Sequence, residues 1–205
     1  MLTKEQIEIL SVFRKDITNK FTFKEIKEKS RKNSNNLIQL AIKNFKKLDI
    51  VKSDKIGNVI IYYLNLDNNL TISYLSIIEQ LKIKNEKKLP KETLNAIQKN
   101  ILKKTEFFIF LVFGSYAKGK TTEKSDLDIV ILTQNKVLKK EIMPYIETIK
   151  RRELLHIHYE IFTRDEFLKM LKVEQENVGK EIYRNNFIYY GVEQYYNLIK
   201  NVTVS

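Results

Sequence analysis

One stretch of the chain, residues 107–132, constrains the fold more than any other, because two apolar runs flank a short polar segment. The first run, 107–113, is seven consecutive apolar residues, and the second, 129–132, is four. Runs of this kind, rich in aromatic and β-branched residues and bounded by Gly or polar residues, predict strands buried on both faces. We therefore expect an α/β (α+β) domain with a mixed sheet that contains both strands.

The polar segment carries two carboxylates that point the same way. Gly114-Ser115 ends the first run, ten residues (116–125) follow, and Asp126-Leu127-Asp128 leads into the second run. Residues two apart on a strand share a face, so Asp126 and Asp128 are expected side by side. Two close carboxylates repel unless a cation lies between them, and Mg²⁺ prefers such oxygen ligands. The spacing therefore predicts a Mg²⁺ site.

The residues that follow the first strand suit a polyphosphate. Gly114 lets the backbone approach a phosphate without a Cβ in the way. Ser115 can donate its hydroxyl and its backbone N–H to a β- or γ-phosphate. Lys118 and Lys120 can neutralise charge on a triphosphate. We predict that these four residues bind a nucleoside triphosphate.

A third carboxylate is expected on a neighbouring strand. Residues 156–163 alternate, with His156, His158 and Glu160 on one face. Glu160 is the best candidate to bind a second metal ion or to take the proton from an attacking hydroxyl. Three other carboxylates fit less well, because they precede the strand or begin the next helix: Glu153, Asp165 and Glu166. The two histidines are interpreted as a polar strand face at the rim of a cleft, with metal ligation as the alternative.

The order of apolar strand, Gly114-Ser115, ten residues and Asp126-Leu127-Asp128 resembles the minimal nucleotidyltransferases of the DNA polymerase β superfamily. The resemblance covers about residues 90–200. It implies Mg²⁺ and a nucleoside triphosphate, often ATP. The third strand of that family often reads Asp-apolar-apolar-Thr, and here Glu160 replaces the Asp in Glu160-Ile161-Phe162-Thr163.

The first third of the chain has a different pattern. The expected elements are helices at 3–16, 23–29 and 37–48 and strands at 50–53 and 59–64 around a turn that contains Gly57. Three helices followed by a hairpin resemble small prokaryotic winged-helix DNA-binding domains. The resemblance implies that the third helix enters the major groove and that the hairpin tip touches phosphates.

Charge supports a polyanionic partner. The net formal charge is +12, and residues 1–66 hold 14 Lys or Arg against 7 Asp or Glu. Such an excess favours nucleic acid, although a general bias toward Lys explains the total equally well. Six basic residues of this region are the expected phosphate contacts: Arg31, Lys32, Lys43, Lys46, Lys47 and Lys55. The alternative is that this domain binds protein or packs on the rest of the chain.

The domain plan is a winged helix at 1–66, a helical linker at 67–89 and a nucleotidyltransferase domain at 90–205. A homodimer formed through the linker helices is one option, and packing on the next domain is the simpler interpretation. With no cysteine, no apolar run near 18 residues and no signal-peptide pattern, we expect a soluble, cytoplasmic protein with no membrane partner.

Together, these expectations predict Mg²⁺-dependent transfer of a nucleoside monophosphate to a hydroxyl acceptor. Transfer of AMP from ATP is the favoured case. Some proteins of the family are antitoxins that transfer AMP to a Tyr of a partner toxin, and others modify tRNA ends or small molecules. DNA binding by the winged helix suits a toxin–antitoxin pair that binds its own operator. Two alternatives stay open: a DNA-binding regulator whose inactive nucleotidyltransferase fold senses nucleotide, and a toxin-type transferase that acts on tRNA.

Overall fold

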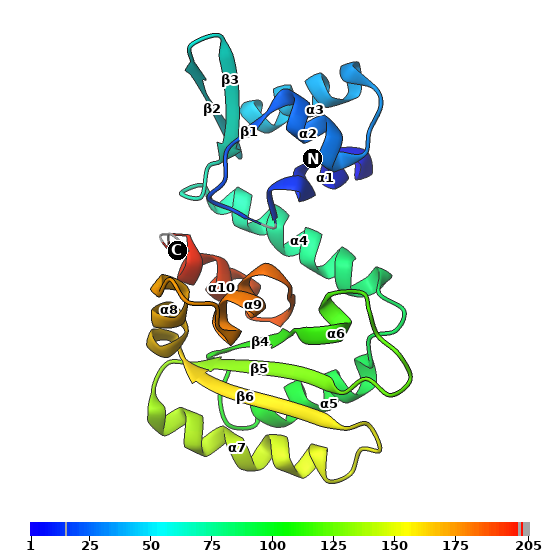
Figure 1. Ribbon diagram of the computed structural model, residues 1–205, viewed down its shortest axis with the longest axis vertical. Helices are drawn as coiled ribbons and strands as arrows, with labels where there is room; N and C mark the ends of the chain where they lie inside the picture. Colours follow the sequence, from blue (N-terminus) through cyan, green and yellow to red (C-terminus); the bar gives the residue numbers. More distant parts are fainter. Residues whose placement is uncertain (15, 201, 203–205) are drawn as a thin grey trace. The chain divides into compact units, whose positions relative to one another are not determined.

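The chain divides into two compact units, Met1–Ile78 and Glu79–Ser205, each with a sheet of its own (Figure 1). The computed structural model describes residues 1–14, 16–200 and 202. The division falls inside helix α4 (Asn69–Asn85), in the segment for which the sequence predicts a helical linker.

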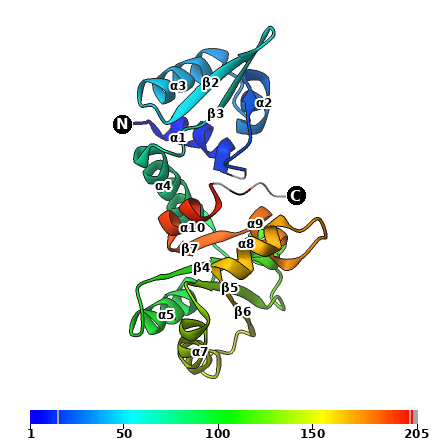
Figure 2. The ribbon, with the colours of Figure 1, turned by 90° about the vertical axis from the view of Figure 1, so that its left-hand side faces the viewer.

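The first unit contains helices and a three-stranded antiparallel sheet with the strand order β1-β3-β2. Its elements are α1 (Lys4–Leu10), a 3-10 turn η1 (Ser11–Arg14), β1 (Phe21–Thr22), α2 (Phe23–Ser30), α3 (Asn35–Lys47), β2 (Val51–Ile56) and β3 (Val59–Leu64). The order of helices followed by a hairpin is the one expected from the sequence. Figure 2 shows this sheet and its helices from a second direction.

Local signals in the sequence explain where these helices begin. Thr3 and Thr22 each accept a hydrogen bond from the backbone N–H three residues on. In turn, the side chain of Gln6 accepts from the backbone N–H of Thr3, and that of Glu25 accepts from the backbone N–H of Thr22. Such capping boxes satisfy backbone donors that a helix start leaves unpaired. Ser34 caps α3 in the simpler way, by accepting from the N–H of Leu37.

Two features of the first sheet differ from expectation. Strand β2 continues to Ile56, beyond the predicted end at residue 53, because the hairpin turn needs only two residues. Gly57 takes the first central position of that turn with a φ of +59°. Strand β1, which pairs Phe21 with Tyr62, was not predicted, since two residues are too few to show a period.

The second unit is an α/β domain built on a four-stranded sheet with the order β6-β5-β4-β7. Its elements after α4 are α5 (Lys91–Leu102), β4 (Phe108–Val112), α6 (Gly114–Ala117), β5 (Leu127–Thr133), α7 (Lys136–Lys150), β6 (Ile157–Thr163), α8 (Arg164–Lys172), α9 (Val178–Arg184), β7 (Phe187–Tyr190) and α10 (Val192–Ile199). Strands β5 and β6 are parallel and the other pairs antiparallel, which confirms the predicted mixed sheet.

Helices cover both faces of this sheet. Figures 1 and 2 show α5 and α7 on one face and α8, α9 and α10 on the other. Leu127, Ile129 and Ile131 of β5 belong to the apolar core on the side of α5 and α7. Because side chains alternate along a strand, Asp126 and Asp128 face the opposite side.

Strand β7 was missed by the sequence analysis. It pairs with β4 and brings two tyrosines onto that strand's aromatic residues. The ring of Tyr190 stacks on that of Phe108 with centroids 4.5 Å apart, and the ring of Tyr189 lies 5.4 Å from that of Phe110. These contacts hold the edge strand in the sheet.

Among the described residues, no helix is long and apolar enough to cross a membrane.

Candidate active site

The centre of the site is the close approach of Gly114 to Asp128. Gly114 begins α6 directly after β4, and Asp128 lies near the start of the adjacent strand β5. Gly114 has a φ of +64°, and a Cβ added there would lie 2.1 Å from Oδ2 of Asp128 and 2.9 Å from its Cγ. The backbone N–H of Phe113 donates to the carbonyl of Asp128 at 3.0 Å, which fixes the approach. Only glycine fits this position.

The surroundings of Asp128 disfavour the negative charge on its carboxylate. Its side chain is 25% exposed, and Asp126 lies two residues away on the same face. Burial raises the pKa of Asp128, and the negative charges of Asp126 and Glu181 raise it further, while His158 and Lys118 oppose the shift. A cation bound at the two aspartates would relieve both the repulsion and the loss of hydration.

The residues after Gly114 carry groups that suit phosphate oxygens. The hydroxyl oxygen of Ser115 is buried and finds no hydrogen-bond partner in the described part of the chain. A buried polar atom of this kind costs free energy unless a ligand or water pairs with it. Lys118 and Lys120 follow and are exposed, and Nζ of Lys118 lies 2.6 Å from Oε1 of Glu181 in α9.

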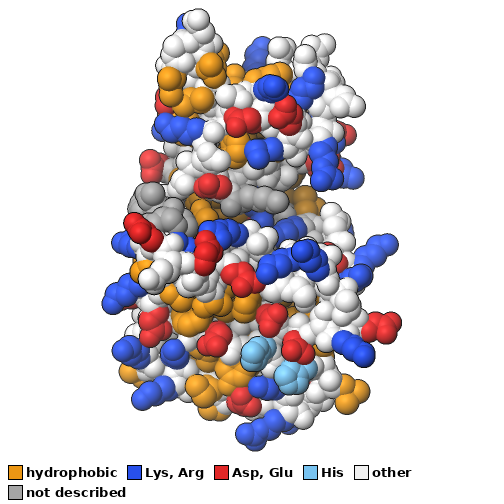
Figure 3. Space-filling view, in the orientation of Figure 1, with side chains coloured by type: hydrophobic (Ala, Val, Ile, Leu, Met, Phe, Trp, Pro, Cys, Tyr) orange, Lys and Arg blue, Asp and Glu red, His pale blue; other side chains and the backbone are white. Residues whose placement is uncertain are grey.

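The neighbouring strand β6 presents its two histidines to the two aspartates. Nδ1 of His156 lies 3.3 Å from Oδ1 of Asp126, and Nδ1 of His158 lies 3.8 Å from Oδ1 of Asp128. Both imidazoles are largely exposed, and Figure 3 shows them in pale blue beside acidic side chains on the surface. The structure therefore places the histidines at the rim of the site.

Glu160 is not brought beside the aspartates. In the parallel pairing of β5 and β6, His158 lies opposite Asp128, and Glu160 lies opposite Val130. Glu160 is thus two residues, about 6.6 Å, further along its strand, and its side chain is exposed. Within residues 1–14, 16–200 and 202, no group of three or more His, Cys, Asp or Glu side chains is arranged to hold a metal ion. The role of Glu160 stays a prediction.

The remaining carboxylates near β6 have other contacts or positions. Glu153 accepts a hydrogen bond from the hydroxyl of Thr93. Glu166 completes the capping box of α8, where its side chain accepts from the backbone N–H of Thr163. Asp165 lies in the first turn of the same helix.

Sequence reasoning missed Glu181. It lies 63 positions from Lys118, in a helix whose sequence shows no pattern that points to the site. Only the packing of α9 on this part of the domain reveals that a second negative charge, besides that of Asp126, acts on Asp128.

The residues present fit a divalent cation and a polyphosphate. Two carboxylates share a face, a glycine leaves room beside one of them, and an unpaired hydroxyl lies next to that glycine. Asp126 and Asp128 would hold the cation, and oxygens of the polyphosphate and of water would complete its coordination.

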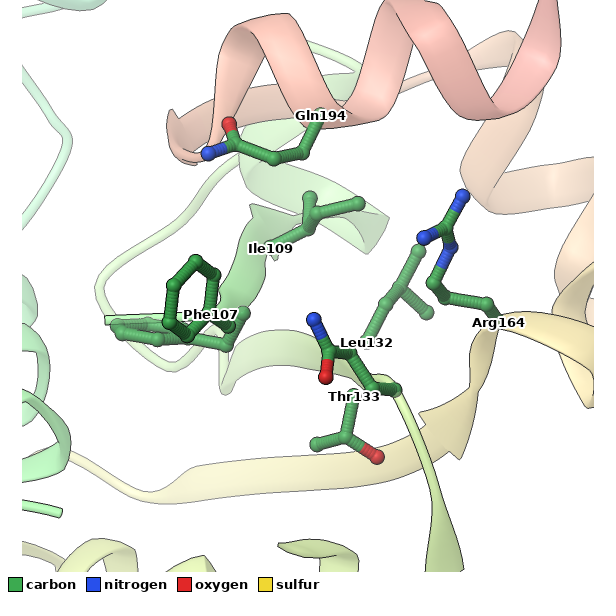
Figure 4. Close-up of a pocket in the computed structure, with 8 residues that line it drawn as sticks. Phe107, Ile109, Leu132, Thr133, Arg164 and Gln194 are labelled. Atoms are coloured by element: carbon green, nitrogen blue, oxygen red, sulfur yellow. The ribbon is translucent and has the colours of Figure 1, made fainter. Parts of the chain in front are cut away.

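A hollow lies at the other end of the same strands, away from the aspartates. It is lined by Phe107–Ile109, Leu132–Gln134, Arg164 and Gln194 (Figure 4). Thr133 is five residues from Asp128 along β5, about 17 Å. This hollow is therefore separate from the aspartate site.

A comparison with protein families gives a match to this α/β domain. Residues 92–188 match the family model described as "Polymerase beta, Nucleotidyltransferase". The second unit thus contains a nucleotidyltransferase domain of the polymerase β superfamily, as the sequence resemblance implied. No curated protein matched the chain. The family match does not extend to the first unit.

In the first unit, three of the six predicted DNA-contacting residues are exposed on α3: Lys43, Lys46 and Lys47. Nζ of Lys46 donates to the hydroxyl of Ser53 on the hairpin at 2.8 Å. Lys55 is exposed on strand β2.

The other two basic residues lie between α2 and α3. Arg31 ends α2 in the left-handed conformation, with a φ of 55°. Lys32 is held by Glu8, with Nζ 2.6 Å from Oε2. Of the six predicted contacts, Lys32 therefore already has an anionic partner within the protein.

Proposed function

We propose that the second unit transfers a nucleoside monophosphate, AMP from ATP in the favoured case, to a hydroxyl acceptor with the aid of Mg²⁺. The observation that carries the proposal is the contact of Gly114 with Asp128, with Asp126 on the same face, inside a domain of the nucleotidyltransferase family. When bound, Mg²⁺ would supply the positive charge that the attacking and leaving oxygens of an in-line displacement need.

The chain's own residues have distinct roles in this proposal. The Ser115 hydroxyl, buried and unpaired among the described residues, donates to a phosphate oxygen of the triphosphate. Lys118 and Lys120 offset its negative charge. The acceptor oxygen forms a bond to the α-phosphorus, the bond from that phosphorus to the bridging oxygen breaks, and pyrophosphate leaves. Glu160, on the same face as Asp128, is proposed to take up the acceptor's proton.

Substitution of the aspartates tests this site. Asp126→Asn and Asp128→Asn keep the size of each side chain and remove its charge. We expect both variants to fold and to lose transfer of label from ATP in the presence of Mg²⁺ and a cell extract. Near-normal transfer by Asp128→Asn would contradict the assignment.

We further propose that the first unit is a winged helix that binds duplex DNA through α3 and the β2–β3 hairpin. Support comes from the exposed Lys43, Lys47 and Lys55 and from the charge excess of residues 1–66. A toxin–antitoxin pair, with a protein Tyr as acceptor and the protein's own operator as DNA target, would use both units.

The identity of the labelled acceptor separates the alternatives. A labelled protein supports the antitoxin-type reaction, and a labelled tRNA supports the toxin-type one. ATP binding without any labelled product supports a regulator that senses nucleotide.

A further inference from the structure

Helix α9 brings a carboxylate to one of the lysines that are proposed to bind the triphosphate. Oε1 of Glu181 lies 2.6 Å from Nζ of Lys118, and the two side chains are 40% and 39% exposed. Lys118 ends α6, and its backbone N–H donates to the carbonyl of Gly114 at 3.1 Å. The charges of both partners act on Asp128, so the ion pair lies within the electrostatic field of the site.

In this arrangement Lys118 already has an anionic partner. To meet a phosphate, its ammonium group must leave Glu181 or share itself between two anions. Half-exposed ion pairs contribute little net stability, because water replaces the lost contact, so the exchange is easy. Lys120, by contrast, shows no ion pair within the part of the chain that the structure describes.

We propose that Glu181 competes with the polyphosphate for Lys118 and thereby lowers the affinity of the site for the pyrophosphate product. This inference rests on the proposed nucleotidyl transfer. A nucleoside triphosphate offers its nucleoside part for further contacts, so Lys118 would supply a smaller share of its binding free energy than it supplies for pyrophosphate. Pyrophosphate binds through its charges alone. As it leaves, the ammonium group of Lys118 returns to its ion pair with Glu181. Glu181 is thus a positioning residue that acts through Lys118.

Binding of inorganic pyrophosphate tests the competition without any turnover. We would measure its dissociation constant by calorimetry on the full chain, without added metal and at fixed ionic strength. Glu181→Gln removes the competing charge and should tighten binding roughly twofold to fivefold, the range expected for one half-exposed ion pair. Glu181→Asp, which keeps the charge, should bind more like the wild type.

Two further variants separate competition from a general change of charge. Glu176→Gln removes a carboxylate just before α9 that pairs with Arg184 at 2.7 Å, and it should leave pyrophosphate binding unchanged. In a Lys118→Met background, Glu181→Gln should lose most of its effect, because the side chain for which it competes is absent.

The outcomes are distinct. Tighter binding by Glu181→Gln that disappears in the Lys118→Met background supports the inference. Unchanged or weaker binding by Glu181→Gln overturns it, and so does a gain that persists without Lys118. If the wild type binds neither ATP nor pyrophosphate, with or without Mg²⁺, the proposed function fails together with this inference.

Discussion

Replacing Gly114 with Ala should disturb the site through one added methyl group. Gly114 has a positive φ of +64°, and the new Cβ would lie 2.1 Å from Oδ2 of Asp128. Both the backbone and the carboxylate must therefore adjust. Gly119→Ala is a matched control, since Gly119 has a φ of +66° and an added Cβ would meet nothing within 4 Å.

The difference between the two variants isolates the cost of the clash. A left-handed conformation costs an L-residue about 1–2 kcal/mol, and both variants share that cost. Both also share the small gain from a less flexible unfolded chain. Gly114→Ala adds the cost of overpacking, about 1–3 kcal/mol. Because the methyl group also displaces the Asp128 carboxylate, we expect a loss of nucleotidyl transfer that Gly119→Ala does not share.

Urea unfolding and the labelled-ATP assay measure the two effects. We expect Gly114→Ala to be inactive and to be less stable than Gly119→Ala by about 1–3 kcal/mol, the cost of overpacking. Equal stability and equal activity of the two variants would refute the close approach of Gly114 to Asp128.

Three other predictions follow from the site and the first unit. Since burial and nearby anions raise the pKa of Asp128 above its usual 3.8, its contribution to stability is present below that value and is lost as pH rises through the folded pKa. Asp128→Asn should therefore unfold at higher urea than the wild type at neutral pH without metal, and an equal or lower midpoint there would contradict this. Glu160→Gln should leave ATP binding intact and slow transfer roughly 10²-fold or more, the scale of a lost general base, and a rate near that of the wild type would remove Glu160 from the mechanism. Replacing Lys43, Lys46 and Lys47 with Ala should weaken DNA binding and flatten its salt dependence in gel-shift titrations, because fewer counterions are released. If the wild type binds no DNA even at low salt, the first unit is a protein adaptor.

The buried strands and the paired aspartates were accessible from sequence because their signals are local. Strand β4 is a continuous apolar run and is buried along its whole length. The shared face of Asp126 and Asp128 follows from the two-residue period of a strand. The missed strand β7 is short and is defined by its partner β4, which lies far away in the chain.

The position of Glu160 shows what alternation cannot decide. A shift of two residues between β5 and β6 leaves every side chain on its own face, so the pattern of 156–163 is compatible with either register. The sequence therefore places His158 and Glu160 on the correct face without telling which of them lies opposite Asp128. The packing of the two strands selects His158.

Nucleotidyl transfer by this domain is tested by comparing ATP labelled at the α-phosphate with ATP labelled at the γ-phosphate. The protein is incubated with each nucleotide, Mg²⁺ and a cell extract. We expect that an acceptor gains label only from α-labelled ATP, that labelled pyrophosphate is released from γ-labelled ATP, and that Asp128→Asn abolishes both. Transfer of the γ-label to the acceptor, or no transfer of either label, would contradict nucleotidyl transfer by this domain.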